Sequence, residues 1–161
     1  MRLHTCSTRN NSLRSIASHF SPPPLFDSKP KAAGFDMMIT ATDRCLIIED
    51  NFVIFLDMED MIISAGFKIV DQAVNLHQVR EHLLHQTYRI ALLDLRLKSG
   101  DSLAILQMLK KHQIPFAITT SYPVENDMGA IFGGAPIVQK PYAIETVNRT
   151  LRELLSRQPK L

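Results

Sequence analysis

Short apolar runs in this 161-residue chain end in side chains that can do chemistry. Carboxylates follow the first and third runs, a hydroxyl follows the fourth and an ammonium follows the fifth: Glu49 and Asp50, Asp94, Thr120, and Lys140. Three carboxylates cannot crowd together without a cation, because like charges disfavour each other's ionisation. Oxygen ligands suit a hard cation such as Mg²⁺, which proteins hold with a few carboxylates, waters and a phosphate oxygen. The pattern therefore indicates magnesium-dependent phosphoryl chemistry.

Each of these side chains can be given a role in phosphoryl transfer. The metal would neutralise an incoming phosphoryl group and align it with the carboxylate of Asp94. Lys140 would contact one phosphoryl oxygen, and the hydroxyl of Thr120 would donate a hydrogen bond to another. Each residue alone has an ordinary explanation: Asp50 would cap a helix, and Lys140 would simply precede a turn proline. Their joint placement at the ends of four of the five apolar runs favours a common site.

The elements that must position these residues alternate along the chain. Apolar runs predict strands at 45–48, 67–70, 90–93, 116–119 and 137–138. Helical spacing and caps predict helices at 51–65, 75–86, from 101 or 102 onward, a short one within 124–134, and 143–156. This alternation indicates an α/β fold, a doubly wound five-stranded parallel sheet with helices on both faces. In such a sheet the chemistry lies beyond the carboxyl ends of the strands.

Composition limits the class of protein. Hydrophobic residues make up 45% and charged residues 21%, which is ordinary for a globular domain. A net charge of +2 gives no strong field for nucleic acid or membrane. The longest apolar run is far below the roughly 20 residues needed to span a bilayer. Two cysteines are too few for a disulfide framework, which favours a reducing, cytoplasmic setting.

The first 42 residues differ from the remainder. They are rich in Ser, Asn and Pro, and they show no sustained apolar period. Such a segment cannot bury enough surface to offset the entropy of ordering it. We interpret 1–42 as a disordered leader, or as an upstream extension of a chain that starts at Met37 or Met38, and 43–158 as the folded domain.

The segment from Arg44 to Arg157 resembles the receiver domain of bacterial response regulators. The matching features are an acidic pair, a phosphorylated aspartate, a switch hydroxyl and a Lys-Pro-aromatic signature: Glu49-Asp50, Asp94 within Leu92–Leu97, Thr120, and Lys140-Pro141-Tyr142. The resemblance implies the (βα)5 flavodoxin-like fold of the CheY-like receivers, with Mg²⁺ as the cofactor. It also implies that Glu49, Asp50 and Asp94 bind the metal, that the Arg96 backbone carbonyl completes the metal shell, and that the Lys140-Pro141 bond is cis.

A narrower resemblance is to stand-alone alphaproteobacterial receivers that carry Phe-Ala-Thr-Gly-X-Tyr after the fourth strand. The corresponding stretch here, residues 118–123, reads Ile-Thr-Thr-Ser-Tyr-Pro. Ser121 replaces the small residue that lets this loop approach the phosphate in that group. Ile137 stands where many receivers have an aromatic switch on strand five, so Tyr122 or Tyr142 would serve instead.

The resemblance implies a single-domain response regulator that takes a phosphoryl group from a histidine kinase or a histidine phosphotransfer protein. Its members catalyse only their own aspartyl phosphorylation and dephosphorylation, and the output here would pass to an unknown downstream protein or along a phosphorelay. The alternative is a phosphorylation-independent receiver-like interaction module. A haloacid-dehalogenase-type phosphatase would need a second Asp where Arg96 stands. A flavodoxin would need a glycine- and hydroxyl-rich loop where Glu49-Asp50-Asn51 stands.

Two further patterns have mainly structural interpretations. His77, Glu81 and His85 are four residues apart and share one face of the predicted second helix. They could bind zinc or copper, but solvated polar faces of this kind are far commoner. Gly133-Gly134 does not follow a strand as a phosphate-binding loop would, and it predicts a turn.

Overall fold

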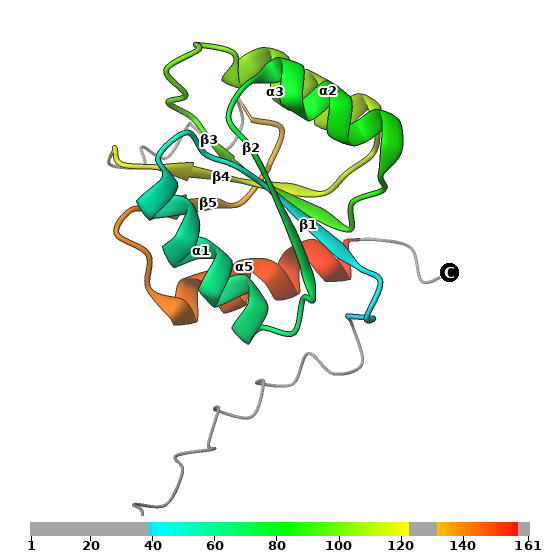
Figure 1. Ribbon diagram of the computed structural model, residues 1–161. Coiled ribbons are helices and arrows are strands. Elements are labelled where there is room, and N and C mark those ends of the chain that lie inside the picture. Colours follow the sequence, from blue (N-terminus) through cyan, green and yellow to red (C-terminus); the bar gives the residue numbers. More distant parts are fainter. Residues whose placement is uncertain (1–38, 123–131, 158–161) are drawn as a thin grey trace, which may run out of the picture.

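A five-stranded parallel sheet forms the middle layer of this computed structural model, which describes residues 39–122 and 132–157 (Figure 1). The strand order is β2-β1-β3-β4-β5. The strands are β1 (Arg44–Ile48), β2 (Ile69–Ala73), β3 (Ile90–Asp94), β4 (Phe116–Thr120) and β5 (Ile137–Gln139). The predicted α/β fold is confirmed, because every neighbouring pair of strands is parallel.

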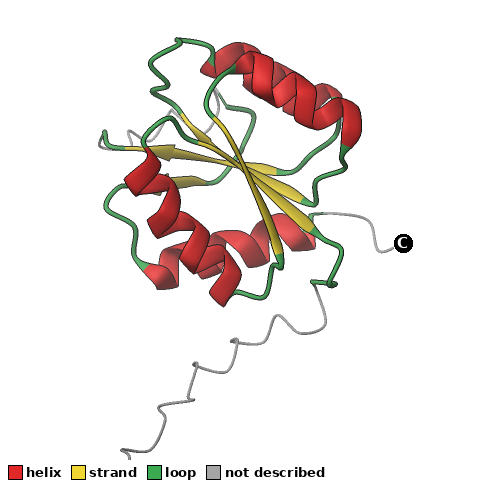
Figure 2. Ribbon diagram, viewed as in Figure 1, coloured by secondary structure: helices red, strands yellow, loops and turns green. Residues whose placement is uncertain are grey.

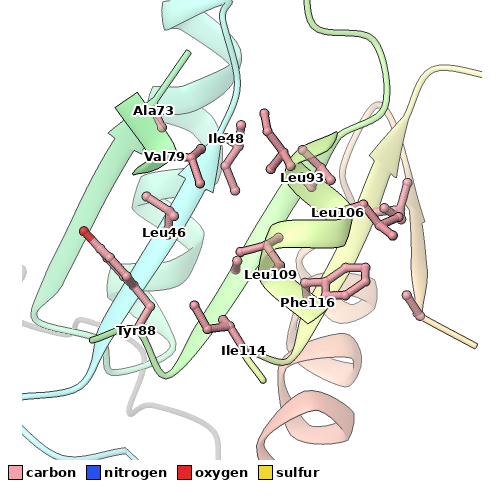
Figure 3. Packing of buried hydrophobic residues seen from close by; sticks show 14 of the residues in the cluster. Leu46, Ile48, Ala73, Val79, Tyr88, Leu93, Leu106, Leu109, Ile114 and Phe116 are labelled. Carbon is pink, nitrogen blue, oxygen red and sulfur yellow. The ribbon is translucent and has the colours of Figure 1, made fainter. Parts of the chain in front are cut away.

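Helices cover both faces of the sheet (Figure 2). They are α1 (Phe52–Ser64), α2 (Leu76–His85), α3 (Ser102–Lys111) and α5 (Ile144–Ser156). One core cluster joins α1 and α5 to the sheet, through residues such as Met58, Ile62 and Leu151. The second cluster lies on the other face, where Val79 of α2 and Leu109 of α3 pack on the strands (Figure 3).

Asparagine side chains cap the first two helices near the carboxyl edge of the sheet. Asn51 caps α1, and its side chain accepts from the Val53 and Ile54 backbone N–H groups. The ordinary explanation of Asp50 as the cap of this helix is therefore wrong. Asn75 caps α2 by accepting from the Gln78 N–H, which agrees with the predicted start of this helix at residue 75.

The second strand was misplaced by the sequence pattern. Phe67–Val70 was predicted, whereas β2 runs from Ile69 to Ala73. Phe67 is fully buried, but its N–H bonds to the Ile62 carbonyl and closes the end of α1 after Gly66, which has φ +117°. Because β2 is an edge strand, it tolerates polar residues such as Asp71 that broke the apolar pattern.

Other predictions have mixed outcomes. The short helix expected within 124–134 lies largely outside the described residues, as does nearly all of the leader. Gly133 and Gly134 form the predicted turn, with φ values of +70° and +75° that favour glycine. His77, Glu81 and His85 are exposed, so they are a solvated helix face. The Lys140-Pro141 bond is cis, as the family resemblance implied.

Candidate functional site

An open cavity of about 460 Å³ lies at the carboxyl edge of the sheet. Its charged lining comes from the loops after β1 and β3 and from the end of β5: Glu49, Asp50, Asp94, Arg96, Lys98 and Lys140. Parallel strands bring their carboxyl ends to one edge, and the neighbours β1, β3, β4 and β5 do so here. The predicted convergence is thus confirmed for the three carboxylates and the ammonium.

The Lys140 ammonium lies between two buried carboxylates. Its Nζ is 2.6 Å from Glu49 Oε2 and 3.0 Å from Asp94 Oδ2. The three side chains are only 10%, 4% and 8% exposed, respectively. Because one ammonium faces two carboxylates, the centre retains an excess negative charge. That excess favours a further cation.

Backbone groups hold the remaining carboxylate oxygens. Glu49 Oε1 accepts from the Asn51 N–H at 3.0 Å, and Asp94 Oδ1 accepts from the Arg96 N–H at 3.1 Å. The Ser102 hydroxyl donates to the Asp94 backbone carbonyl at 3.0 Å and so ties the end of β3 to α3. The Asp94 carboxylate is therefore oriented by the Arg96 N–H on one oxygen and by Lys140 on the other.

Asp50 lines the same cavity but bonds to a different partner. Its Oδ2 accepts from the Lys98 N–H at 2.7 Å, which joins the loop after β1 to the loop after β3. The Lys98 ammonium is 3.9 Å from Asp50 Oδ1 and 81% exposed, so this ion pair is weak. Sequence reasoning missed Lys98, because no motif or periodicity marks the loop residue that will meet Asp50.

Thr120 ends β4 but its hydroxyl is not part of the cavity wall. Thr120 is fully buried, its Oγ1 accepts from the Tyr122 N–H at 3.1 Å, and its carbonyl accepts from the Lys140 N–H. The neighbouring Ser121 lines the cavity instead. The expected meeting of this hydroxyl with the acidic cluster is therefore not present in this conformation, and its switch role stays a prediction.

Comparison with known proteins places this geometry in a family. Residues 45–152 match the family model described as the response regulator receiver domain. The chain belongs to the response regulator receiver family. The two ends of the matched segment coincide closely with the start of β1 and the last turns of α5.

Relatives of this receiver domain include both regulators and isolated domains. The transcriptional regulatory protein TctD of Salmonella typhimurium is 29% identical over 119 residues, which are 71% of this chain and 52% of TctD. The receiver domain of PhyR from Erythrobacter litoralis is 25% identical, with a TM-score of 0.63 over 75% of this chain and 95% of that domain. The BeF3-activated conformation of SdrG from Pseudomonas melonis is 24% identical, with a TM-score of 0.62 over 73% and 99%. The chain spans about half the length of TctD.

The receiver domain's acidic cluster suits a hard divalent cation in its chemistry. Its donors are oxygens, and three carboxylates, those of Glu49, Asp50 and Asp94, line one open cavity together with Arg96. Within residues 39–122 and 132–157, no three His, Cys, Asp or Glu side chains stand together as a ready metal shell. The carboxylates instead bond to Lys98 and Lys140. Binding a metal here would require the hydrogen bonds of Asp50 to the Lys98 N–H and of Asp94 to Lys140 to break or lengthen.

A cation–π contact joins two residues that line the cavity. The Arg96 guanidinium sits 4.9 Å from the centroid of the Tyr122 ring. Both residues line the cavity, and Tyr122 is about half exposed. The contact connects the loop after β3 to Tyr122, whose backbone N–H donates to the Thr120 hydroxyl. Tyr122 was singled out from the sequence, but its pairing with Arg96 was not.

Burial and neighbouring charges perturb the ionisable groups of the cluster. Burial raises the pKa of Glu49, and Asp94 adds to the rise, although hydrogen bonds from Lys140 and the Asn51 N–H oppose it. Burial alone would lower the pKa of Lys140, but the hydrogen bond to Glu49 and the charges of Tyr142 and Asp94 raise it overall. Burial also raises the pKa of Tyr142. Lys140 therefore stays charged at neutral pH.

The raised pKa of Glu49 gives a testable pH dependence. A carboxyl group whose pKa is higher in the folded state binds protons preferentially there, so its contribution to stability grows as the pH falls from 7 towards its usual range. Glu49→Gln is expected to remove this gain in the metal-free protein, because the amide does not titrate. Urea unfolding at pH 7 and pH 5 measures the gain, and an unchanged difference in the variant would contradict the assignment.

No helix in the part of the chain that the structure describes is long and apolar enough to cross a membrane.

Proposed function

We propose that this receiver domain accepts a phosphoryl group on Asp94 from a phosphohistidine donor in the cytoplasm. The observation that carries the proposal is the buried Lys140 ammonium, which contacts Asp94 and Glu49 beside an open cavity. An Asp94 carboxylate oxygen attacks phosphorus, the bond from phosphorus to the donor imidazole nitrogen breaks, and that nitrogen keeps the electron pair. Hydrolysis later returns the carboxylate and releases phosphate. The domain acts only on itself and is not an enzyme for other substrates.

The side chains of the cavity have distinct roles in this proposal. Lys140, already 3.0 Å from Asp94, pairs with a phosphoryl oxygen as charge builds on it. Asp50, Asp94 and the Arg96 carbonyl would hold Mg²⁺. Glu49, also predicted as a ligand, has both carboxylate oxygens engaged by the Asn51 N–H and Lys140, so it would orient Lys140 beside the metal instead. Magnesium, when bound, supplies neutralisation of the phosphoryl charge. The Arg96 N–H on Asp94 Oδ1 keeps the acceptor carboxylate in a fixed orientation.

The proposed response to phosphorylation lies in the loop after β4. A phosphoryl group adds negative charge and strong acceptor oxygens. The Thr120 hydroxyl would have to leave the Tyr122 N–H and donate to a phosphoryl oxygen. Tyr122 would then lose a backbone partner, and its contact with Arg96 would change. The output surface for the downstream protein is therefore expected to include Tyr122.

Magnesium dependence is the test of this proposal. Incubation with acetyl phosphate and Mg²⁺ is expected to add one labile phosphate, detected by intact mass. Chelation with EDTA is expected to slow labelling at least about a hundredfold, because most of the transition-state charge stabilisation is removed. Labelling that is equally fast in EDTA would remove the basis for a metal-assisted acceptor.

The beginning of α1 offers a docking surface for the phosphodonor protein. Phe52 and Val53 are 61% and 67% exposed, and they follow directly on Asn51, which lines the cavity. Exposed apolar groups beside a reactive pocket are typical of protein-binding sites. A helical partner that carries phosphohistidine, either a histidine kinase or a histidine phosphotransfer protein, fits this surface.

A charge placed on this surface should separate docking from chemistry. Phe52→Asp is expected to slow transfer from a phosphotransfer protein that labels the wild type by about tenfold or more, the cost of losing one well-placed interface residue. Acetyl phosphate labelling should stay unchanged. Leu84→Asp is a matched control, because Leu84 is 72% exposed on α2, away from the cavity. Equal effects of both substitutions on the rate of phosphoryl transfer from the phosphotransfer protein would argue against this surface as the docking site.

A phosphorylation-independent interaction module is the second candidate. The hydrogen bond of Thr120 to the Tyr122 N–H and the presence of Ser121 at the cavity favour it. Such a module would bind its partner equally well with or without the phosphodonor. The acetyl phosphate experiment separates the two functions, because only the first predicts labelling.

A further inference from the structure

An apolar and acidic stripe runs along the outer side of α1. Phe52, Leu56 and Ile63 are 61%, 41% and 43% exposed, and at helical spacing they fall within about 40° of each other around the axis. Glu59 and Asp60 lie at the same side by the same spacing. The helix carries three acidic residues and no basic one. An exposed stripe of this kind on a single helix indicates an interaction site.

The chain itself supplies a segment close to this stripe. Ile39, the first described residue, packs against the core cluster shared with α1. Its Cδ1 lies next to Gly66, just beyond the carboxyl end of the helix. Residues 1–38 therefore join the domain at one end of the stripe.

The composition of residues 1–38 complements the stripe. The segment contains five basic and two acidic residues: Arg2, Arg9, Arg14, Lys29 and Lys31, against Asp27 and Asp36. Leu25 and Phe26 follow three prolines and precede Lys29 and Lys31. Twelve residues separate Phe26 from Ile39, and this stretch reaches up to about 40 Å when extended, whereas α1 is about 20 Å long. Phe26 can therefore reach any point on the stripe.

We propose that residues 25–31 dock on the α1 stripe of the same chain. Leu25 and Phe26 cover Phe52 and Leu56, and the two lysines pair with acidic side chains of the helix. Linkage in one chain gives an effective concentration of about 1 mM. A dissociation constant of about 0.1 mM would therefore leave only about a tenth of the molecules undocked. The docked segment would cover the surface proposed above for the phosphodonor protein. This consequence rests on the proposed function, whereas the docking itself does not.

A single tryptophan tests the contact without phosphorylation. The chain contains no tryptophan, so Phe26→Trp in the full chain creates a unique fluorescent reporter. We expect blue-shifted emission and protection from acrylamide quenching, both lost when Leu56→Asp is added and retained when Leu84→Asp is added. Emission indifferent to Leu56→Asp would overturn the proposal. A blue shift that disappears on dilution would mean contact between copies and would also overturn it.

A synthetic peptide added to a shortened chain provides a second, independent test of the docking. A chain that starts at Met38 keeps both core clusters, because their members begin at residue 39. A synthetic peptide of residues 20–34 is expected to shift the amide signals of 52–63 with sub-millimolar affinity. Exchange of both lysines, Lys29→Glu and Lys31→Glu, should weaken binding at least about threefold at low salt. Shifts centred on α2, or none at millimolar peptide, would refute the docking. Because neither readout involves Asp94, failure of the proposed function leaves this test intact.

Discussion

Asp94→Asn is expected to abolish phosphate labelling by acetyl phosphate in the presence of Mg²⁺. The amide that replaces the carboxylate is a poor nucleophile, and it cannot form an aspartyl phosphate. Asparagine has nearly the same shape, and its amide oxygen can still accept from the Arg96 N–H, while Lys140 keeps its contact with Glu49. The loss should therefore come from chemistry rather than from misfolding, and the far-ultraviolet circular dichroism spectrum should stay unchanged.

Intact mass spectrometry checks this expectation. The wild type should gain one phosphate that is lost at alkaline pH, and the variant should gain none. Asp57→Asn is a suitable control, because Asp57 is an exposed acid on α1 that does not contact Asp94. Equal labelling of Asp94→Asn and wild type would show that another residue is the acceptor.

Lys140→Met is expected to produce the second large effect, on both stability and rate. Without the ammonium, Glu49 and Asp94 remain buried at 4% and 8% side-chain exposure with no counter-ion between them. Breaking a buried pair in this way costs about 3 to 5 kcal/mol. Loss of the donor to a phosphoryl oxygen should also slow labelling by about 10² to 10³ fold.

Urea unfolding in EDTA measures the first effect, and the initial rate of labelling measures the second. Lys98→Met is the matched control. Lys98 is 81% exposed and 3.9 Å from its acidic partner, so its loss should change stability by less than about 0.5 kcal/mol. A Lys140→Met protein that is as stable as the wild type would mean that the ammonium does not hold the two carboxylates together.

The sequence alone was enough to predict a five-stranded parallel sheet, because buried parallel strands are apolar on both faces and stand out as short apolar runs. It also placed Glu49, Asp50, Asp94 and Lys140 correctly, because the topology forces the ends of such strands to one edge. β2 was harder. An edge strand has a neighbour on one side only, so four of its five residues are only partly buried and its apolar pattern is weak. The buried Phe67 just before it therefore shifts the predicted start of the strand.

The hydrogen-bond partners of the side chains within the site could not be predicted from the sequence. Thr120 has a backbone N–H only two residues away, and such local bonds compete with longer-range partners. Asp50 meets the Lys98 N–H through the path of a loop rather than through any spacing. The pairing of Arg96 with Tyr122 joins two loops whose approach depends on the whole fold. Residue types thus predicted which groups share the cavity, but not which of them bond.

The central claim is that this fold gathers its acidic side chains around one divalent cation. A crystal grown with Mn²⁺ in place of Mg²⁺, measured for anomalous scattering, tests it directly. We predict one strong peak held by Asp50, Asp94 and the Arg96 carbonyl, with the Asp50 carboxylate released from the Lys98 N–H. No peak in this cavity, with Asp50 still bonded to Lys98 and with Lys140 on both carboxylates, would contradict it.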